Sequence, residues 1–208
     1  MDAGQKLPAR MYLLAYDLDK DRPSGRAWLD YLVQGAALTE LLAEGLLIDT
    51  GVTVIPAVDG PADEVLGLVW QQAAGGRPHA WRGLLHQGRA TLAAVEDQLI
   101  QSGAFERKGR GLVAMDREGI AALQARARQI MRGEAGEEGS AVLDAALVAV
   151  ASVIPLRTVC DRRRRRQDRE RVDALTRRVS LKAPGFDRML QQMRRTRGRS
   201  YATGGPAH

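Results

Sequence analysis

The sequence predicts a mainly α-helical single domain, in which a bundle of helices surrounds one buried apolar helix and carries short β-hairpins at its rim. Apolar residues make up 45% of the chain but aromatic residues only 4%, so the core is mostly Leu, Ala and Val, which favour packed helices. An amphipathic helix, a glycine and a short hairpin follow one another twice. A long apolar run, Ala141–Leu156, comes after them. The 208 residues suit one well-buried domain and are few for two.

The first of the two copies lies in the N-terminal quarter. Met11–Tyr16 reads as a strand, and an acidic turn follows from Asp17 to Gly25. Apolar residues spaced three and four apart then predict a helix over Ala27–Glu44. Gly45 ends it, at a position where a left-handed cap favours glycine, and a hairpin over 46–58 follows.

The second copy repeats this order. A helix ends at Gln101, Gly103 stops it, and a hairpin is expected over 104–116. Between the copies, Asp63–Ala73 reads as a helix and Gly75–His79 as a loop.

The next segments are a helix over Gly119–Arg132, an acidic glycine-rich linker over Gly133–Gly139 and the apolar run Ala141–Leu156. This run is too short for a membrane span of about 20 residues, and it contains Asp144 and Pro155. We therefore expect it to form a buried core helix.

The chain is expected to divide into a flexible N-terminus (1–8), a folded domain (9–180) and a basic, disordered tail (181–208). The last helix of the domain is predicted from Arg162 to Val179.

Charge is distributed unevenly along the chain. Residues 1–156 hold 15 Lys/Arg and 20 Asp/Glu, a net −5, whereas residues 157–208 hold 16 and 5, a net +11. Such polarity favours an anionic partner, either lipid or nucleic acid, although a charge run is often only a solvated face.

Several short segments occur in an order that resembles one protein family. They are the opening LLAYD, GAALTELLAEGLLID, DEVLGLV, HAWRGLL, QLIQSGAF and the late RERVDAL, and the resemblance that they carry covers roughly residues 9–180. In order and spacing the chain resembles the Golgi phosphoprotein 3 family. The resemblance implies a helical bundle and a peripheral membrane protein, and the eukaryotic members bind phosphatidylinositol 4-phosphate. The Arg- and Ala-rich composition indicates a bacterial-type member.

The resemblance also implies where a lipid headgroup would bind. Eukaryotic members use a tryptophan and three arginines, whose positions correspond here to Gly25, Gln34, Arg89 and Leu92. Only the arginine at 89 is retained, so cations and tryptophans near these positions are expected to complete the site; tryptophan favours the membrane interface. The predicted headgroup residues are Arg89, Arg26, Trp28, Trp81 and Arg82.

The second hairpin is apolar in the family, where it mediates self-association and membrane contact, but here its tip carries a cluster of charges. Cations near an anionic surface contribute about 1 kcal/mol each, so this tip is expected to lie on headgroups rather than insert deeply. The predicted contacts with an anionic surface are Arg107, Lys108, Arg110, Arg162, Arg163, Arg164, Arg165 and Arg166.

Patterns typical of catalysis are scarce, and we expect no enzyme, cofactor or metal site. The three histidines lack ligand spacing, and no phosphate-binding loop or nucleophile elbow occurs. The acidic turn over 17–21 lacks the glutamate that would complete a calcium loop. Cys160 is the only cysteine and is expected to pack as a small hydrophobe, and the N-terminus lacks a secretion signal, so a cytoplasmic protein at a membrane surface is expected.

Two further kinds of partner stay open. One is a second copy of the chain or another protein. The other is nucleic acid, since a helix followed by a hairpin is also the outline of a winged helix and the arginine-rich C-terminal helix could track phosphates. Against nucleic acid, Ala36–Leu42 is too apolar to face a groove, and the second helix carries Glu96 and Asp97 where cations would be expected.

Overall fold

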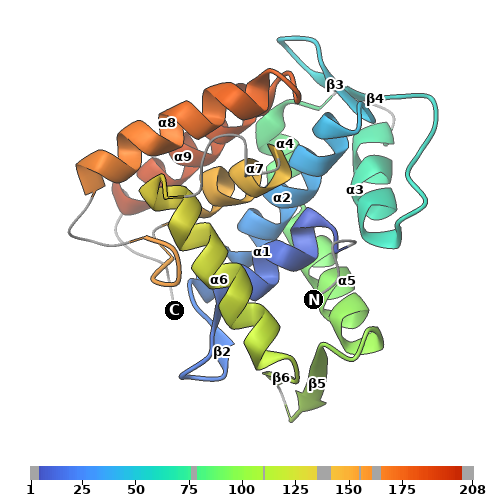
Figure 1. Cartoon of the computed structure of the whole chain (residues 1–208). Coiled ribbons are helices and arrows are strands. Elements are labelled where there is room, and N and C mark those ends of the chain that lie inside the picture. Colours follow the sequence, from blue (N-terminus) through green and yellow to red (C-terminus); the bar gives the residue numbers. More distant parts are fainter. Residues whose placement is uncertain are drawn as a thin grey trace.

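A computed structural model describes residues 5–75, 79–109, 111–134, 142–154, 156–160 and 165–202. In these residues helices form the bulk of the molecule (Figure 1). They are α1 (Leu7–Ala15), η1 (Arg26–Trp28, a 3-10 turn), α2 (Leu29–Ala43), α3 (Glu64–Ala74), α4 (Trp81–Leu85), α5 (Gly88–Gln101), α6 (Arg117–Arg132), α7 (Val142–Ala151), α8 (Arg165–Ser180) and α9 (Phe186–Ala202). The strands form three antiparallel pairs: β1 (Tyr16–Asp17) with β2 (Arg22–Pro23), β3 (Leu47–Asp49) with β4 (Val54–Pro56), and β5 (Phe105–Lys108) with β6 (Gly111–Ala114). The predicted fold class is confirmed.

Three helices, α1, α2 and α7, pack against one another at the centre of the molecule. In α7 every residue from Ala145 to Ala151 is buried, which confirms that the apolar run forms a core helix, although α7 ends at Ala151 rather than Leu156. The other two are as deeply buried, with 8 of 9 residues in α1 and 13 of 15 in α2. No helix within the described ranges is long and apolar enough to cross a membrane.

The strand predicted over Met11–Tyr16 is wrong, because this segment belongs to helix α1. A helix buried on nearly every side reads as a continuous apolar run, which periodicity cannot distinguish from a buried strand. Pro8 occupies the first turn, where its missing N–H costs nothing, and the backbone N–H of Leu7 donates to Glu40 Oε2 at 2.5 Å. The predicted flexible N-terminus is accordingly wrong at residues 7 and 8, which are helical and buried.

Both predicted hairpins are present, as the pairs β3–β4 and β5–β6. Gly45 and Gly103 stop the preceding helices with φ angles of 72°, in the left-handed region that glycine adopts without strain. Helix α3 matches its prediction closely, with the Asp63 side chain accepting a hydrogen bond from the N–H of Leu66 as an N-cap. The pair β1–β2 was not predicted.

The predicted disordered tail is wrong over helix α9. Phe186, Met189, Leu190 and Met193 lie on one side of this helix and are buried. Met193 packs so closely on Gly35 of α2 that a Cβ there would meet its Cε at 2.6 Å. The apolar spacing was a readable signal, but the many arginines between these residues concealed it.

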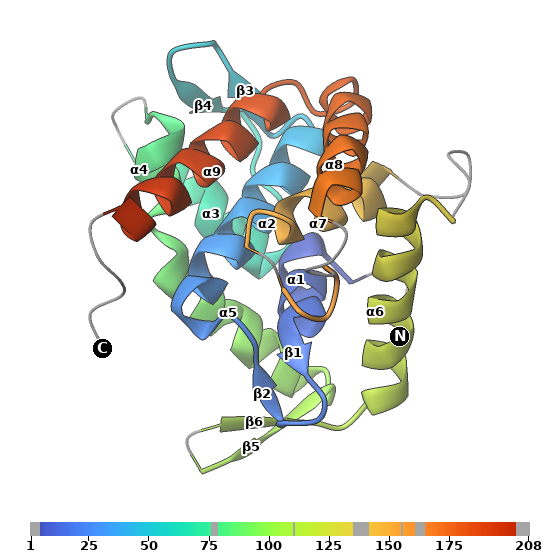
Figure 2. The same cartoon turned by 90° about the vertical axis from the view of Figure 1, so that its left-hand side faces the viewer.

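The hairpins mark two opposite ends of the molecule, as Figure 2 shows. Strands β1, β2, β5 and β6 lie together at one end, here called the double-hairpin end. The β3–β4 hairpin lies at the other, beside the turn between α8 and α9, where Arg188 Nε is 2.9 Å from Asp49 Oδ2.

Candidate functional site

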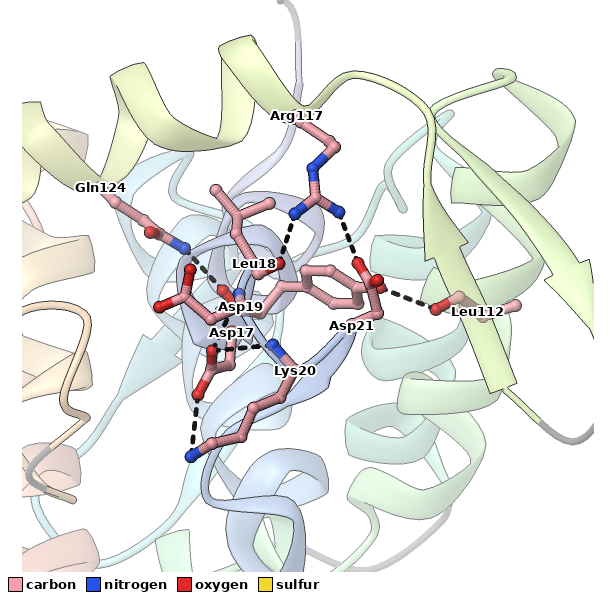
Figure 3. Close-up of polar contacts among 9 residues, drawn as sticks. Asp17, Leu18, Asp19, Lys20, Asp21, Leu112, Arg117 and Gln124 are labelled. Atoms are coloured by element: carbon pink, nitrogen blue, oxygen red, sulfur yellow. Dashed lines mark hydrogen bonds and ion pairs between the residues drawn. The ribbon is translucent and has the colours of Figure 1, made fainter.

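The acidic turn at the double-hairpin end is held by its own backbone. Asp17 Oδ1 accepts hydrogen bonds from the N–H groups of Asp19 at 3.1 Å and Lys20 at 3.3 Å, and Asp17 Oδ2 lies 3.4 Å from Lys20 Nζ (Figure 3). The Asp17 charge is thus countered within the turn. Across the part of the chain that the structure describes, no three His, Cys, Asp or Glu side chains are grouped so as to hold a metal ion.

Arg117, the first residue of α6, fixes this turn to the rest of the fold. Its guanidinium donates to Asp21 Oδ1 at 2.5 Å and to the carbonyl oxygen of Leu18 (Figure 3). On the adjoining strand, the Tyr16 hydroxyl donates to the carbonyl oxygen of Leu112 in β6 at 2.9 Å. The turn therefore has a defined position against α6 and the β5–β6 hairpin.

A pocket of about 400 Å³ opens beside this turn, and we call it the basic pocket. Four of its lining side chains are cations, which come from the turn, β2, η1 and the segment after α7. The lining residues are Asp17, Lys20, Arg22, Pro23, Ser24, Gly25, Arg26, Ile154, Leu156 and Arg157.

The cations of the basic pocket are exposed and poorly compensated. Among the described residues, none forms an ion pair or a side-chain hydrogen bond with Arg22, Arg26 or Arg157. Asp17 is the one carboxylate in the lining, and it is already engaged by Lys20. Clustered like charges in a hollow of the surface create a local positive potential that attracts anions.

Comparison with known families places the chain. The family model for Golgi phosphoprotein 3 (GPP34) matches residues 7–193. The chain belongs to the Golgi phosphoprotein 3 family. Its match extends into the first half of α9, as far as Met193, which agrees with the burial of Phe186, Met189, Leu190 and Met193. No curated protein matches the chain.

Gly25, which the resemblance predicts to stand at the position of the headgroup tryptophan, lies in the basic pocket with a φ angle of 66°. A Cβ there would lie 3.3 Å from Leu156 Cδ2, a tight contact, and the positive φ angle also favours glycine.

Gln34, which the resemblance predicts to correspond to the first headgroup arginine, is not available at the surface. Its side chain is fully buried between α2 and α5, where Nε2 donates to Gln72 Oε1 at 2.8 Å and to the carbonyl oxygen of Leu84 at 2.9 Å, and Oε1 accepts from Thr91 Oγ1 at 2.5 Å. Leu92 is partly buried against the core. The inherited positions therefore form no cluster of cations at the surface.

The predicted headgroup residues do not all share one site. Arg26 is the one that lines the basic pocket, and Arg89 is exposed in the first turn of α5. Trp28 is half-buried, with its ring edge-on to Tyr31 at a centroid distance of 5.8 Å. Burial raises the pKa of Tyr31, and the positive charge of Arg82 opposes that rise. Arg82 therefore lies near Tyr31.

Trp81, a predicted headgroup residue, is instead largely buried. Its indole is only 9% exposed, and its Nε1–H donates to Asp49 Oδ2 at 3.2 Å, beside β3 at the opposite end from the double hairpin. The indole ring packs in the core, and its N–H already donates a hydrogen bond to Asp49.

Of the predicted surface contacts, Arg107 and Lys108 are exposed at the tip of β5, with Arg107 Nη2 3.4 Å from Asp97 Oδ1. Arg110 and Arg162–Arg164 lie outside the described residues, as do the side chains of Arg165 and Arg166.

Sequence reasoning missed three of the four pocket cations, Lys20, Arg22 and Arg157. Lys20 and Arg22 alternate with acidic residues, which made the segment read as an acidic turn. Arg157 comes from a segment about 130 residues further on, and no local sequence pattern predicts that it lines the same pocket.

Proposed function

We propose that this protein binds anionic membranes peripherally from the cytoplasm, with the double-hairpin end toward the lipid and a phosphoinositide as its ligand by family resemblance. One observation carries the proposal, namely that the basic pocket and the charged tip of β5 share one end of the molecule. The cations concerned are Lys20, Arg22, Arg26, Arg157, Arg107 and Lys108.

The binding free energy that these cations can contribute suits a reversible interaction with a membrane surface. Each contributes about 1 kcal/mol near an anionic leaflet, so several acting together hold a protein reversibly at the membrane. The interaction fades with salt, because the screening length falls to about 8 Å at physiological ionic strength.

We infer binding rather than catalysis from the chemistry of the pocket. Guanidinium and ammonium groups hold anions, whereas the pocket's Ser24 hydroxyl donates to the carbonyl oxygen of Ala15 at 2.8 Å and the Asp17 carboxylate is engaged by the turn. Cys160 lies elsewhere, and burial raises the pKa of its thiol to about 11, so the thiolate that would act as a nucleophile is scarce at neutral pH.

The alternative of a winged-helix nucleic-acid binder receives less support. Helix α2, the first candidate for a groove, is buried along most of its length between neighbouring helices. The second candidate, α5, carries Asp97 paired with Arg107 of the hairpin.

Sedimentation with lipid vesicles tests the proposal. Wild-type protein should bind vesicles of phosphatidylcholine with phosphatidylserine or phosphatidylinositol 4-phosphate, bind pure phosphatidylcholine little, and lose binding between low and physiological salt. Duplex DNA at matched salt should compete poorly.

Two charge reversals provide matched variants. Lys108→Glu alters the double-hairpin end, whereas Lys182→Glu makes the same change in the exposed turn before α9, at the other end. We expect Lys108→Glu to weaken vesicle binding more than Lys182→Glu. Equal binding to neutral vesicles would refute the electrostatic account, and equal effects of the two reversals would refute the orientation.

A further inference from the structure

A hollow on the outer side of helix α8 combines exposed cations with an exposed leucine, and we call it the α8 groove. We propose that this groove docks an acidic, partly apolar segment of another protein. The groove is separate from the basic pocket, so the inference goes beyond the proposed function. Its volume is about 290 Å³, and its lining among the described residues is Arg171, Ala174, Leu175, Arg177, Arg178 and Leu181.

The groove has a fixed shape because its walls belong to the folded core. Residues three, four and seven apart, as Arg171, Leu175 and Arg178 are, lie on one side of a helix. Leu175 is buried at the base of the groove, whereas Leu181 is 83% exposed at the end where α8 stops. At the opposite end, Arg171 Nε donates to the carbonyl oxygen of Ile130 in α6 at 3.0 Å. The hollow is therefore a defined part of the fold.

The charge of the groove favours a partner that carries carboxylates. Its described lining holds three arginines and no carboxylate, and Lys182 follows Leu181 at an exposed position. Asp173 is the only acidic residue between positions 171 and 182, and its Oδ1 lies 3.6 Å from Arg194 Nη1 on α9. Guanidinium groups bind carboxylates through pairs of parallel hydrogen bonds, which select for geometry as well as charge.

The helix dipole accounts for only part of this pattern. Cations in the last turn of a helix interact favourably with its carbonyl end, which accounts for Arg177 and Arg178. The dipole does not account for Leu181, a large apolar side chain that stands in water at the edge of the same groove. Protein interfaces are enriched in arginine and bury an apolar centre, so the combination fits a protein partner.

The size and position of the groove also indicate a protein segment. Pockets for small molecules usually measure about 300–1,000 Å³, so a hollow of about 290 Å³ suits a few side chains of a peptide. In both views α8 lies toward the end of the molecule away from β5 and β6 (Figure 1, Figure 2). With the double-hairpin end toward lipid, the α8 groove faces away from the membrane and stays open to a partner.

Nucleic acid fits this surface less well. Asp168 and Glu170 interrupt the positive charge of α8 directly before the groove begins. The basic stretch from Arg171 to Lys182 is therefore only about 16 Å long, at 1.5 Å per residue. A phosphate backbone is held tightly by many cations acting along its length, and this stretch is too short to supply them.

Fluorescence anisotropy with synthetic peptides tests the groove on the full-length chain. The probe is a peptide of about 15 residues, roughly four helical turns, with glutamate and leucine at spacings of three and four. A second peptide has serine in place of each leucine, so it keeps the charge and loses the apolar side. At physiological salt we expect the leucine peptide to bind about tenfold more tightly than the serine peptide.

Two matched pairs of variants locate the contact. Arg177→Glu should weaken peptide binding at least about tenfold, the usual effect of losing a charge-assisted hydrogen bond. Its control is Arg195→Glu, because Arg195 is also exposed but lies on α9 outside the groove. Leu181→Ser should weaken binding about fivefold, whereas Val58→Ser, at an exposed position after β4, should change it little. Circular dichroism of the four variants should match wild type, since each altered side chain is exposed.

Peptide binding that depends on both Arg177 and Leu181 supports the groove. Equal losses in Arg177→Glu and Arg195→Glu, equal binding of the two peptides, or no effect of Leu181→Ser would show diffuse charge alone and overturn the proposal. Duplex DNA that binds more tightly than the leucine peptide, and is weakened by Arg177→Glu, would assign the surface to nucleic acid instead. A dimer in sedimentation velocity that Leu181→Ser abolishes would assign it to a second copy of the chain.

Vesicle sedimentation with the same variants separates this inference from the proposed function. Arg177→Glu should bind phosphatidylcholine vesicles containing phosphatidylserine as wild type does, and an equal loss of vesicle and peptide binding would overturn a separate docking surface. If wild type binds these vesicles but not the leucine peptide, the groove is refuted and the proposed function stands. If it binds the peptide but not the vesicles, the groove stands and the proposed function is refuted.

Discussion

The contact between α2 and α5 is so close that one added methyl group should disrupt it. A Cβ at Gly88 would lie 2.2 Å from the carbonyl oxygen of Asp30 and 3.1 Å from Gln34 Cβ. An ordinary contact of this kind is at least about 3.4 Å, so Gly88→Ala forces the two helices apart by about 1 Å. The obstacle is backbone and has no rotamer by which to move aside.

Overpacking of this kind costs about 1–3 kcal/mol, and a backbone clash belongs at the top of that range. At roughly 2–4 °C per kcal/mol for a chain of this size, the midpoint of thermal unfolding should fall by about 6–12 °C. The separation should also loosen the hydrogen bond of 2.5 Å between Thr91 and Gln34.

Gly67→Ala is the matched control, because this glycine also lies in a helix, but its added Cβ would meet only the carbonyl oxygen of Pro61 at 3.7 Å. It should raise the free energy of unfolding by about 0.5–1 kcal/mol, since alanine favours a helix interior over glycine. Thermal and urea unfolding followed by circular dichroism measure both variants. A Gly88→Ala protein that melts at or above the wild-type midpoint would refute the close packing of α2 on α5.

Two further perturbations follow from the core. Leu147→Asp places a charge in α7 at a position only 2% exposed, and should cost several kcal/mol and prevent cooperative folding. The control Leu181→Asp, at a position 83% exposed, should change the free energy of unfolding by less than about 0.5 kcal/mol. A cooperative melt of Leu147→Asp near the wild-type midpoint would contradict the burial of α7. Glu40 is 2% exposed, and burial raises the pKa of its carboxyl above the ordinary 4.5. Ionising this carboxyl therefore costs more free energy in the folded chain than in the unfolded chain. As pH rises from about 4.5 through the raised pKa, the ionisation of Glu40 lowers the free energy of unfolding. Glu40→Gln removes this dependence, so its free energy of unfolding relative to wild type should rise with pH in urea titrations between pH 4.5 and 7; a relative stability that is flat or falls over this range would show that the Leu7 and Lys6 contacts outweigh burial.

Features set by local sequence were predictable. The glycine stops at Gly45 and Gly103, both hairpins after them and the apolar helix α7 each follow from spacing or from a conformation that glycine favours. Helix α1 was not predictable by the same means, because burial on all sides removes the periodicity that distinguishes helix from strand. Helix α9 carried its apolar spacing among arginines, and composition outweighed it in the prediction.

The candidate site likewise contains residues that the sequence could predict and residues that only the folded structure brings in. Arg26 was found because it stands beside the family's tryptophan position, whereas Arg157 reaches the pocket only through the packing of the segment after α7. Family likeness also pointed to Gln34, which hydrogen bonding has turned into a core residue.

The contacts of Arg117 with the acidic turn connect the β5–β6 hairpin to one wall of the basic pocket. Strand β6 ends at Ala114, Arg117 follows three residues later, and its guanidinium grips Leu18 and Asp21 in the segment that also presents Lys20. Under the proposed binding of an anion in the pocket, thermodynamic linkage makes any coupling through this contact reciprocal, so an anion that orders the pocket wall should also order the hairpin.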